Sequence, residues 1–284
     1  MSRNLGASIR ARLKNHADAA KEDFNLTLTR YGLERLLYRL SVSPHADRFL
    51  LKGALLFSLW YDQPHRPTRD ADLLAFGSDE VDAMVDAFRA ICAVLCDDGI
   101  VFDPANVRGA EIRKSAGYGG VRIDISALLD GARIALQVDV GFGDAVTPGP
   151  QAVRYPVLLD GLPAPALSAY PKATVVAEKL HAICLLGLAN TRMKDYFDLD
   201  LLLRDEVLNA AELRRAIEAT FERRKLKLPG HWPVGLDEAF AGDPIKQAQW
   251  TGFLRKNRLE PVPLPELIER LRAGLARLRA SDSG

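Results

Sequence analysis

Two acidic residues at strand spacing are the first feature of the sequence that could carry chemistry. Asp70 and Asp72 lie in the segment RDADLLAF, and because side chains alternate along a strand, both point to the same face. Asp139 lies in LQVDVGF, where the same alternation puts Val138 and Val140 on the core face and Asp139 opposite them. If the two strands are neighbours, three carboxylates converge, and Mg²⁺ prefers such oxygen ligands. Metal ions held there would activate an attacking oxygen and stabilise a departing pyrophosphate.

The segments before the acidic pair add groups that suit phosphate binding. Gly53 and Ala54 stand at an expected helix start, where a backbone N–H is available to an anion, and Lys52 directly precedes them. A basic loop with Arg66, Thr68 and Arg69 then leads directly into the acidic pair. An Asp-x-Asp pair taken alone is more often a solvated pair at a strand edge. The context, rather than the pair itself, therefore favours a nucleotide site made of these residues.

A second cluster follows in VVAEKLHAICLLGLANTRMKDYFDLDLLL. Lys179 stands within an apolar helical pattern, Asp195 follows sixteen residues later, and Asp198 lies one helical turn further on. A lysine at such a position could neutralise triphosphate charge as a point cation. The alternative is a buried Lys–Asp bridge between two helices. The spacing leaves open whether Asp195 or Asp198 is the functional carboxylate.

Histidine and cysteine do not indicate a second kind of site. His181 has no second histidine at ligand spacing, so we expect an ordinary core or surface histidine rather than a catalytic one. Cys92, Cys96 and Cys184 are an odd number of cysteines without a Cys/His partner pair, which is typical of free thiols in a reducing compartment.

Composition indicates an ordinary globular chain. Of 284 residues, 48% are hydrophobic, and 38 Lys and Arg nearly balance 37 Asp and Glu. This excludes a disordered or collagen-like chain. No apolar stretch reaches the roughly 18–20 residues of a membrane span, and the N-terminus lacks the apolar segment of a signal peptide. We therefore expect a cytoplasmic protein with no membrane association.

Basic residues gather in two C-terminal segments, RRAIEATFERRKLK (214–227) and FLRKNR (253–258). Such runs are often only solvated helix faces. Phe221, Trp232, Trp250 and Phe253 lie among or near them, and a surface of cations and rings would suit nucleic acid. Both interpretations remain open at this level.

The elements that must position these groups follow an α+β order. Apolar spacing predicts two helices before Pro44, a strand over 69–76 and a helix beginning at Ser78. Alternating residues on either side of Asp130 and Gly131 predict a hairpin. Further predicted elements are a helix over 49–60, a proline-rich linker or loop over 143–171, and helices over 172–189, 193–205, 210–227 and 264–280. We expect N-terminal helices at 1–45, a core with a small mixed sheet at 46–165 and a helical domain at 166–284.

Five separated motifs in order resemble the AbiEii/AbiGii toxin family of nucleotidyltransferases, which includes the MenT toxins and belongs to the DNA polymerase beta-like superfamily. They are LKGALLFSLW…HRPTRDADLL, LQVDVGFGDAV, YP, VVAEKLHAI and NTRMKDYFDL. The resemblance implies a metal-binding pair at Asp70 and Asp72, a third carboxylate at Asp139, and a functional Lys179 and Asp195. Gly53 is followed by Ala54 where the superfamily has Gly-Ser or Gly-Gly, so a hydroxyl contact to phosphate is missing and a backbone contact remains.

The leading hypothesis is a Mg²⁺-dependent transfer of NMP from an NTP to an acceptor hydroxyl. The resemblance further implies a growth-inhibiting toxin, a cognate antitoxin, a role in phage defence, and the 3′ end of tRNA as acceptor. Two alternatives remain: nucleotidylation of a protein side chain, and a non-catalytic module that binds nucleic acid or a partner protein.

Overall fold

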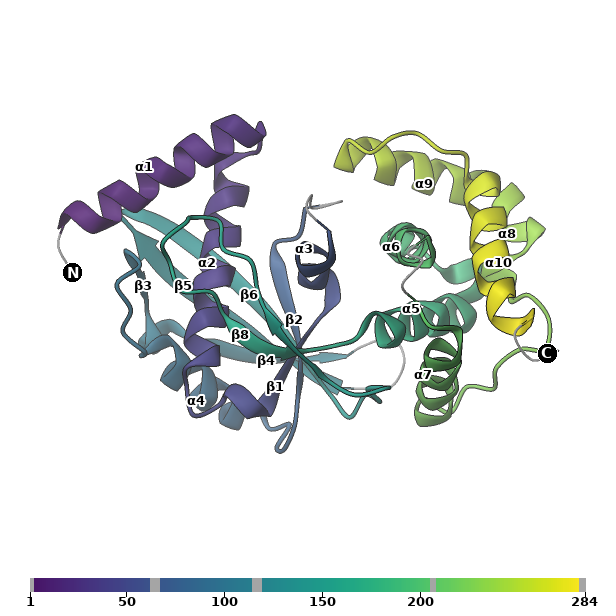
Figure 1. The fold of residues 1–284 in the computed structure, drawn as a ribbon, viewed down its shortest axis with the longest axis horizontal. Coiled ribbons are helices and arrows are strands. Elements are labelled where there is room, and N and C mark those ends of the chain that lie inside the picture. Colours follow the sequence, from purple (N-terminus) through teal and green to yellow (C-terminus); the bar gives the residue numbers. More distant parts are fainter. Residues whose placement is uncertain (1–2, 62–66, 114–118, 205–207, 281–284) are drawn as a thin grey trace. The chain divides into compact units, whose positions relative to one another are not determined.

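The chain forms two compact units (Figure 1), and the computed structural model describes residues 3–61, 67–113, 119–204 and 208–280. Unit 1 comprises Met1–Gly143 and Gln151–Ala169, and unit 2 comprises Asp144–Pro150 and Tyr170–Gly284. The segment 1–45 lies in unit 1 together with the sheet. Unit 1 combines helices with a mixed sheet and the described part of unit 2 is helical, so the predicted α+β class is confirmed.

Unit 1 is built on a mixed sheet with eight strands among the described residues. The strands are β1 (Phe49–Lys52), β2 (Asp70–Ala75), β3 (Ile100–Phe102), β4 (Arg108–Arg113), β5 (Gly119–Leu129), β6 (Ala132–Phe142), β7 (Gln151–Arg154) and β8 (Ala166–Ala169). Their order is β3-β5-β6-β2-β1-β8-β7, and β4 also pairs with β5. β2 runs parallel to β6 and β1 parallel to β8, while the other pairs are antiparallel. The predicted strand over 69–76 is therefore confirmed as β2.

The β5–β6 hairpin forms where the sequence predicts it. Asp130 and Gly131 join the strands with φ of +45° and +77°, the left-handed pair that a two-residue turn needs for its twist to match that of the strands. The turn sets the register, so Val138 and Val140 of β6 are buried on the core side. Asp139 consequently lies on the opposite face, as predicted.

Helices cover the apolar face of this sheet. α1 (Arg3–Ala20) and α2 (Phe24–Ser41) confirm the two helices predicted before Pro44, and α4 (Val81–Cys92) confirms the helix predicted after Ser78. α2 lies close against β6, because a Cβ added to Gly32 would come within 3.0 Å of the Leu136 side chain. The absence of a side chain at this position therefore allows the close approach.

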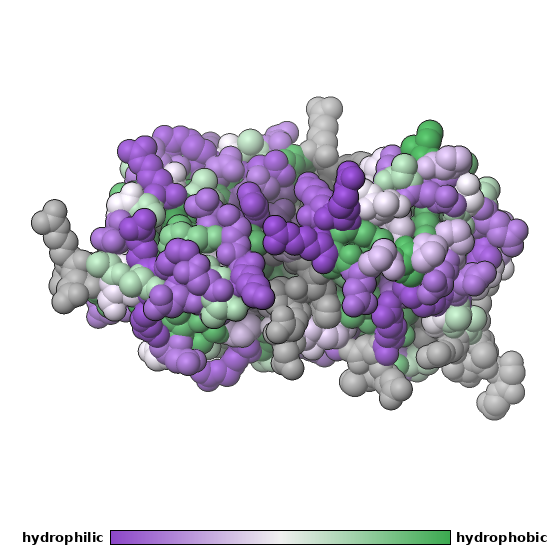
Figure 2. Space-filling view, turned by 90° about the horizontal axis from the view of Figure 1, so that it is seen from above, coloured by the Kyte–Doolittle hydropathy of each residue, from purple (hydrophilic) through white to green (hydrophobic). Residues whose placement is uncertain are grey.

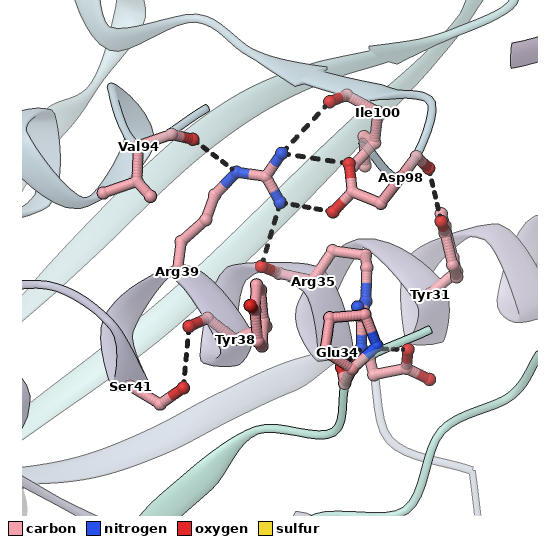
Figure 3. A network of polar contacts seen from close by, with 10 residues as sticks. Tyr31, Glu34, Arg35, Tyr38, Arg39, Ser41, Val94, Asp98 and Ile100 are labelled. Atoms are coloured by element: carbon pink, nitrogen blue, oxygen red, sulfur yellow. Dashed lines mark hydrogen bonds and ion pairs between the residues drawn. The ribbon is translucent and has the colours of Figure 1, made fainter. Parts of the chain in front are cut away.

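A buried arginine anchors α2 to the segment before β3 (Figure 3). The guanidinium of Arg39 donates to both carboxylate oxygens of Asp98, at 2.7 and 3.0 Å, and to the backbone carbonyls of Val94, Ile100 and Arg35. Only 2% of the Arg39 residue is exposed. Because the charge is paired and hydrogen-bonded on every side, this burial is tolerated and fixes the helix in one position.

The prediction of one helix over 49–60 is wrong. This segment contains β1, a 3₁₀ helix (Gly53–Leu56) and the short helix α3 (Phe57–Trp60). Gly53 has a φ of +72°, a left-handed conformation that separates the strand from the helical turn. A fully buried strand and a buried helix both read as an unbroken apolar run, so the periodicity could not distinguish them.

The prediction of a linker or loop over 143–171 is also wrong in part. β7 and β8 lie in this segment and pair antiparallel with each other, and β8 joins the sheet beside β1. Proline lacks the N–H that a sheet ladder needs. All six prolines of the segment fall outside these two strands and delimit them instead.

Unit 2 is a set of packed helices. They are α5 (Lys172–Leu186), α6 (Met193–Leu203), α7 (Ala210–Arg223), α8 (Glu238–Gly242), α9 (Pro244–Asn257) and α10 (Leu264–Ala280). The four predicted helices are confirmed, whereas the sequence analysis missed α8 and α9. The core includes Trp250 of α9 and a stack of Tyr196 on Phe240 with ring centroids 5.0 Å apart.

In the part of the chain that the structure describes, no helix is both long and apolar enough to cross a bilayer. On the face shown in Figure 2, hydrophilic side chains predominate and hydrophobic ones occur in small groups among them.

Candidate functional site

The three predicted carboxylates share one face of two neighbouring strands. Asp70 and Asp72 lie at the start of β2, two residues apart and half-buried. β2 pairs with β6 in parallel, and Asp72 is the register partner of Asp139. Register partners in a sheet project to the same side, so Asp72 and Asp139 lie next to each other. The strand pairing that the carboxylate hypothesis required is therefore present.

Gly53 forms a close contact with the second aspartate. A Cβ added to Gly53 would lie 2.7 Å from both Cβ and Cγ of Asp72, and closer still to its Oδ2. No side chain fits there. Glycine at this position is therefore explained by two features, its positive φ and its close approach to Asp72. The preceding residue, Lys52, is the register partner of Asp72 across β1 and β2 and is only 6% exposed. Sequence reasoning placed Lys52 and Gly53 near the acidic pair, and the structure brings them there.

The basic loop is only partly described. Thr68 lies in front of β2, and its hydroxyl donates to Oδ1 of Asp70 at 2.7 Å, which orients that carboxylate. Arg69 is exposed. Arg66, which we expected to bind phosphate, lies outside the described residues.

Arg122 is a member of this face that the sequence analysis missed. Its Nε and Nη2 donate to the two oxygens of Asp139, each at 2.9 Å, and this hydrogen bonding raises the pKa of Arg122. Asp139 is largely buried, with 13% of its side chain exposed, whereas Arg122 is 39% exposed. A signal was available: once the turn at Asp130 and Gly131 is placed, hairpin register puts residue 122 opposite residue 139.

The carboxylate oxygens on this face are ligands that suit a hard cation such as Mg²⁺. The three carboxylates do not, however, form a preformed metal site. Asp70 and Asp72 offer the oxygen ligands that Mg²⁺ takes. Both oxygens of Asp139 are engaged by Arg122. Among the described residues, no group of three or more His, Cys, Asp or Glu is arranged to hold a metal ion. The residues therefore fit a metal bound mainly through the Asp70 and Asp72 pair, and a ligand role for Asp139 stays a prediction.

In unit 2, Lys179 lies between two buried aspartates. Its Nζ is 3.2 Å from Oδ1 of Asp195 and 2.7 Å from Oδ2 of Asp198, and each aspartate side chain is 2% exposed. The aspartates are three residues apart on α6 and therefore share a helix face. Arg192 adds a second cation, with Nε 2.7 Å from Oδ2 of Asp195. Because both aspartates contact Lys179, the geometry does not single out Asp195 or Asp198 as the functional carboxylate.

Glu178, the neighbour of Lys179, belongs to a second set of ion pairs. One nitrogen of Arg224, Nη2, lies 2.8 Å from Glu178 and 2.8 Å from Asp144. Arg224 is only 14% exposed, so the suggestion that it belongs to a basic surface for nucleic acid is wrong. Phe221 and Trp250 are buried in the core, so they do not offer exposed rings for base stacking either.

His181 is buried, with 2% exposure, and its ring packs edge-on against Phe221 at 5.2 Å between centroids. Neither ring nitrogen has a hydrogen-bond partner among the described residues. Burial, and next the charge of Arg224, lower the pKa of His181 to about 4. The ring is therefore neutral at neutral pH and belongs to the core.

Comparisons with known proteins identify the family. The family model described as the nucleotidyl transferase AbiEii toxin of a type IV toxin-antitoxin system matches residues 35–277. No curated protein matches the sequence. The similar solved structures include two at low identity. A candidate nucleotidyltransferase from H. pylori is 16% identical, with 87% of this chain and 91% of that chain covered and a TM-score of 0.49. JHP933 from Helicobacter pylori is 14% identical, with 87% and 88% covered and a TM-score of 0.48.

The family match extends over most of the chain and contains both the acidic face of unit 1 and the Lys179 cluster of unit 2, which confirms the resemblance found in the motifs. The chain therefore belongs to the AbiEii family of nucleotidyltransferase toxins of type IV toxin-antitoxin systems.

Proposed function

We propose that this protein transfers a nucleoside monophosphate from an NTP to an acceptor hydroxyl with Mg²⁺ as cofactor. In this reaction the hydroxyl oxygen bonds to the α-phosphorus, the bond between the α- and β-phosphates breaks, and pyrophosphate leaves. The observation that carries the proposal is the juxtaposition of Asp70, Asp72 and Asp139 on one sheet face, with Gly53 against Asp72. Family membership provides independent support.

We assign the residues of unit 1 as follows. Asp70 and Asp72 would hold the metal, which when bound neutralises phosphate charge and lowers the pKa of an attacking hydroxyl. Thr68 keeps the Asp70 carboxylate in place through its hydrogen bond. The backbone at Gly53, where a helical turn starts, offers N–H groups to phosphate oxygens. Lys52 and Arg69 supply positive charge for the phosphate groups.

In unit 2 we assign Lys179 to the triphosphate and the Asp195 and Asp198 pair to its positioning. Two buried carboxylates around one ammonium hold it in a single place. The competing role is purely structural, as a bridge between α5 and α6. Stability and activity measurements on the same variants separate the two roles.

The acceptor we favour is the 3′ end of tRNA, as in the toxin families that the motifs resemble, with a cognate antitoxin to restrain the activity. The test incubates the protein with each α-labelled NTP in turn, Mg²⁺, and either total RNA or total cell protein. Label in tRNA that does not form when the 3′ diol of the RNA has first been oxidised with periodate supports the proposal. Label in protein would instead establish nucleotidylation of a side chain.

Two variants make this test decisive. Asp72→Asn removes one oxygen charge from the acidic pair at nearly constant volume, and Asp86→Asn makes the same change on the exposed surface of α4. Label that is present with wild type and Asp86→Asn and absent with Asp72→Asn locates the reaction at the acidic pair. If wild type labels neither RNA nor protein with any NTP, the non-catalytic alternative stands.

A further inference from the structure

A pocket of about 430 Å³ opens in unit 1 between α2, α3 and the segment after β7. It is lined by Arg30, Glu34, Ser58, Trp60, Tyr61 and residues 154–158. None of the described residues that line it belongs to the acidic face. Its volume lies within the range of about 300–1,000 Å³ that small-molecule sites occupy. The pocket is therefore large enough for a ligand of nucleotide class and needs its own explanation.

The floor of the pocket carries a buried acceptor. Glu34 is 1% exposed, and its Oε2 accepts the backbone N–H of Leu158 at 2.6 Å. Its Oε1 lies 2.7 Å from Arg35 Nη2 but accepts no hydrogen bond of good geometry from the described residues. Figure 3 shows Glu34 beside Arg35 on α2. The ion pair with Arg35 balances the charge of this carboxylate, and its Oε1 has the capacity to accept a further hydrogen bond from a ligand.

The walls of the pocket are aromatic. Trp60 and Tyr61 come from the end of α3, where Phe57 packs against both rings with centroids 5.7 and 6.0 Å away. Tyr155 faces them from the segment after β7, and its hydroxyl forms a hydrogen bond with Ser58. Burial raises the pKa of Tyr155 to about 12, so this hydroxyl is neutral. Rigid rings of this kind accept the flat face of an unstacked base.

Two arginines complete the lining. Arg154 is exposed at the pocket. Arg30 lies with Nη1 2.8 Å from Oε1 of Glu22, and a guanidinium has further donors beyond that nitrogen. Guanidinium groups bind phosphate through paired N–H donors. The pocket thus combines rings, a hydrogen-bond acceptor and cations, which are the three features that a single nucleotide requires.

A short helical segment connects the acidic face to the pocket. The helical segment Gly53–Trp60 begins against Asp72 and ends in the aromatic wall. With rises of about 2.0 and 1.5 Å per residue for its 3₁₀ and α parts, the segment spans roughly 14 Å at most. An RNA whose end reaches the acidic face is therefore within a few nucleotides of the pocket.

We propose that this pocket binds one nucleotide, with the base between Trp60, Tyr61 and Tyr155, an amino group of the base donating to Glu34, and the phosphate on Arg30 and Arg154. The ligand is a free nucleoside monophosphate or an unpaired nucleotide of an RNA. Because uracil has no amino group, the pocket prefers cytidine to uridine nucleotides. Binding here does not depend on the transfer reaction.

The experiment measures binding of labelled CMP and UMP by equilibrium dialysis in EDTA, so that no metal-dependent binding contributes. We expect saturable CMP binding, about fivefold tighter than that of UMP, because one hydrogen bond contributes about 1 kcal/mol. Tyr61→Ala and Arg154→Ala each weaken CMP binding about tenfold or more through lost stacking or lost phosphate contact. Arg133→Ala, at an exposed arginine on β6, leaves it unchanged.

Glu34→Gln tests the contact between Glu34 and the amino group of the base. Glu34 is buried, so this variant can fail to fold. In that case Tyr61→Ala and Arg154→Ala still test whether CMP binds in the pocket. Equal affinity for CMP and UMP, or CMP binding that survives both surface variants, overturns the proposal. Competition against labelled CMP shows whether the natural ligand is a free nucleotide or an unpaired nucleotide of an RNA. The competitors are a hairpin RNA with a single-stranded 3′ cytidine tail and a blunt hairpin RNA. Displacement of CMP by the tailed RNA alone identifies an unpaired RNA nucleotide, and displacement by neither RNA identifies a free nucleotide.

Discussion

Arg122 on β5 binds both carboxylate oxygens of Asp139 on β6, each at 2.9 Å. The pair stands beside Asp72, the register partner of Asp139 on the other side. Arg122 is therefore a cation that balances charge on the acidic face, and it occupies the oxygens that a third metal ligand would need. The state of this ion pair decides how many carboxylates the site offers to Mg²⁺.

Replacing Arg122 with Ala should make the protein more dependent on Mg²⁺. Without the guanidinium, three neighbouring carboxylates repel one another, so the melting temperature falls in EDTA, and Mg²⁺ recovers more of it than in wild type. Thermal unfolding with and without 5–10 mM Mg²⁺, roughly the range where weak metal sites fill, measures the difference. Arg133→Ala serves as the control. An equal Mg²⁺-induced shift in Arg122→Ala and wild type would contradict the charge-balancing role.

Replacing Asp70 or Asp72 with Ala should abolish transfer while the fold persists. Loss of a metal ligand removes several kcal/mol of transition-state stabilisation, so activity falls by about two orders of magnitude or more. The folded state tolerates the change because repulsion between neighbouring carboxylates is relieved. Initial rates with saturating NTP, together with circular dichroism, report the two effects. Residual activity above about one hundredth of wild type would show that the pair is not the metal site.

Gly53→Ala should impair the reaction far more than Gly77→Ala. Both glycines have positive φ, +72° and +95°, so alanine introduces similar backbone strain of about 1 kcal/mol at each. Only at position 53 does the new Cβ collide with Asp72, whereas nothing lies within 4 Å of a Cβ at position 77. We expect a lower melting temperature and a large loss of turnover in Gly53→Ala, and only the small effect of backbone strain in Gly77→Ala. Similar turnover in the two variants would show that the contact with Asp72 does not matter.

Lys179→Met should destabilise unit 2, because two buried aspartates then lose their shared cation, a change that typically costs about 3 kcal/mol or more. Adding Asp198→Asn removes one of the stranded charges and should restore part of the stability. The decisive measurement is activity in the double variant. Recovery of stability without recovery of NTP turnover assigns Lys179 to the reaction, and recovery of both leaves it a structural bridge. Lys194→Met, at an exposed position, provides the control.

Stability should fall as the pH is lowered through the range set by His181. The folded-state pKa of His181, about 4, lies below its ordinary value of 6.5, so the unfolded chain binds a proton that the folded chain rejects. Stability is complete above about pH 6.5 and declines progressively toward pH 4, by up to roughly 3 kcal/mol. The charge of Arg224 lowers the pKa of this histidine and that of Asp144 raises it, while the ring of Phe221 packs against it.

Urea unfolding at several pH values between 7.5 and 4.5 tests this dependence. His181→Gln should flatten the curve relative to wild type, whereas His231→Gln, at an exposed position, should not. A wild-type curve that is no steeper than that of His181→Gln would refute the assignment.

Local signals accounted for much of unit 1. Asp130 and Gly131 specify their turn because few residue pairs accept two successive positive φ values, and that turn sets the register of β5 and β6. Period-two alternation placed Asp139 on the face opposite Val138 and Val140. These predictions succeeded because each depends on residues close together in the chain.

Other features depended on contacts between distant segments. The run from Phe49 to Trp60 reads as a helix until its strand pairs with β2 and β8, and the proline-rich segment yields β7 and β8 only because a sheet edge is available for pairing. Arg224 reads as a surface charge until Asp144 and Glu178 surround it. A local sequence pattern does not indicate which distant residues will pair with a given strand or charge.

By itself the sequence determined the kinds of chemistry available: an acidic pair on a strand, a third carboxylate on a hairpin, and a lysine with two aspartates at helical spacing. It also carried the motifs of the family. Only the tertiary structure decided which charges meet, namely Arg122 with Asp139, Gly53 against Asp72, and Lys179 with both Asp195 and Asp198. The physical reason is that ion pairing acts through space over a few ångströms, between residues separated by many positions in the chain.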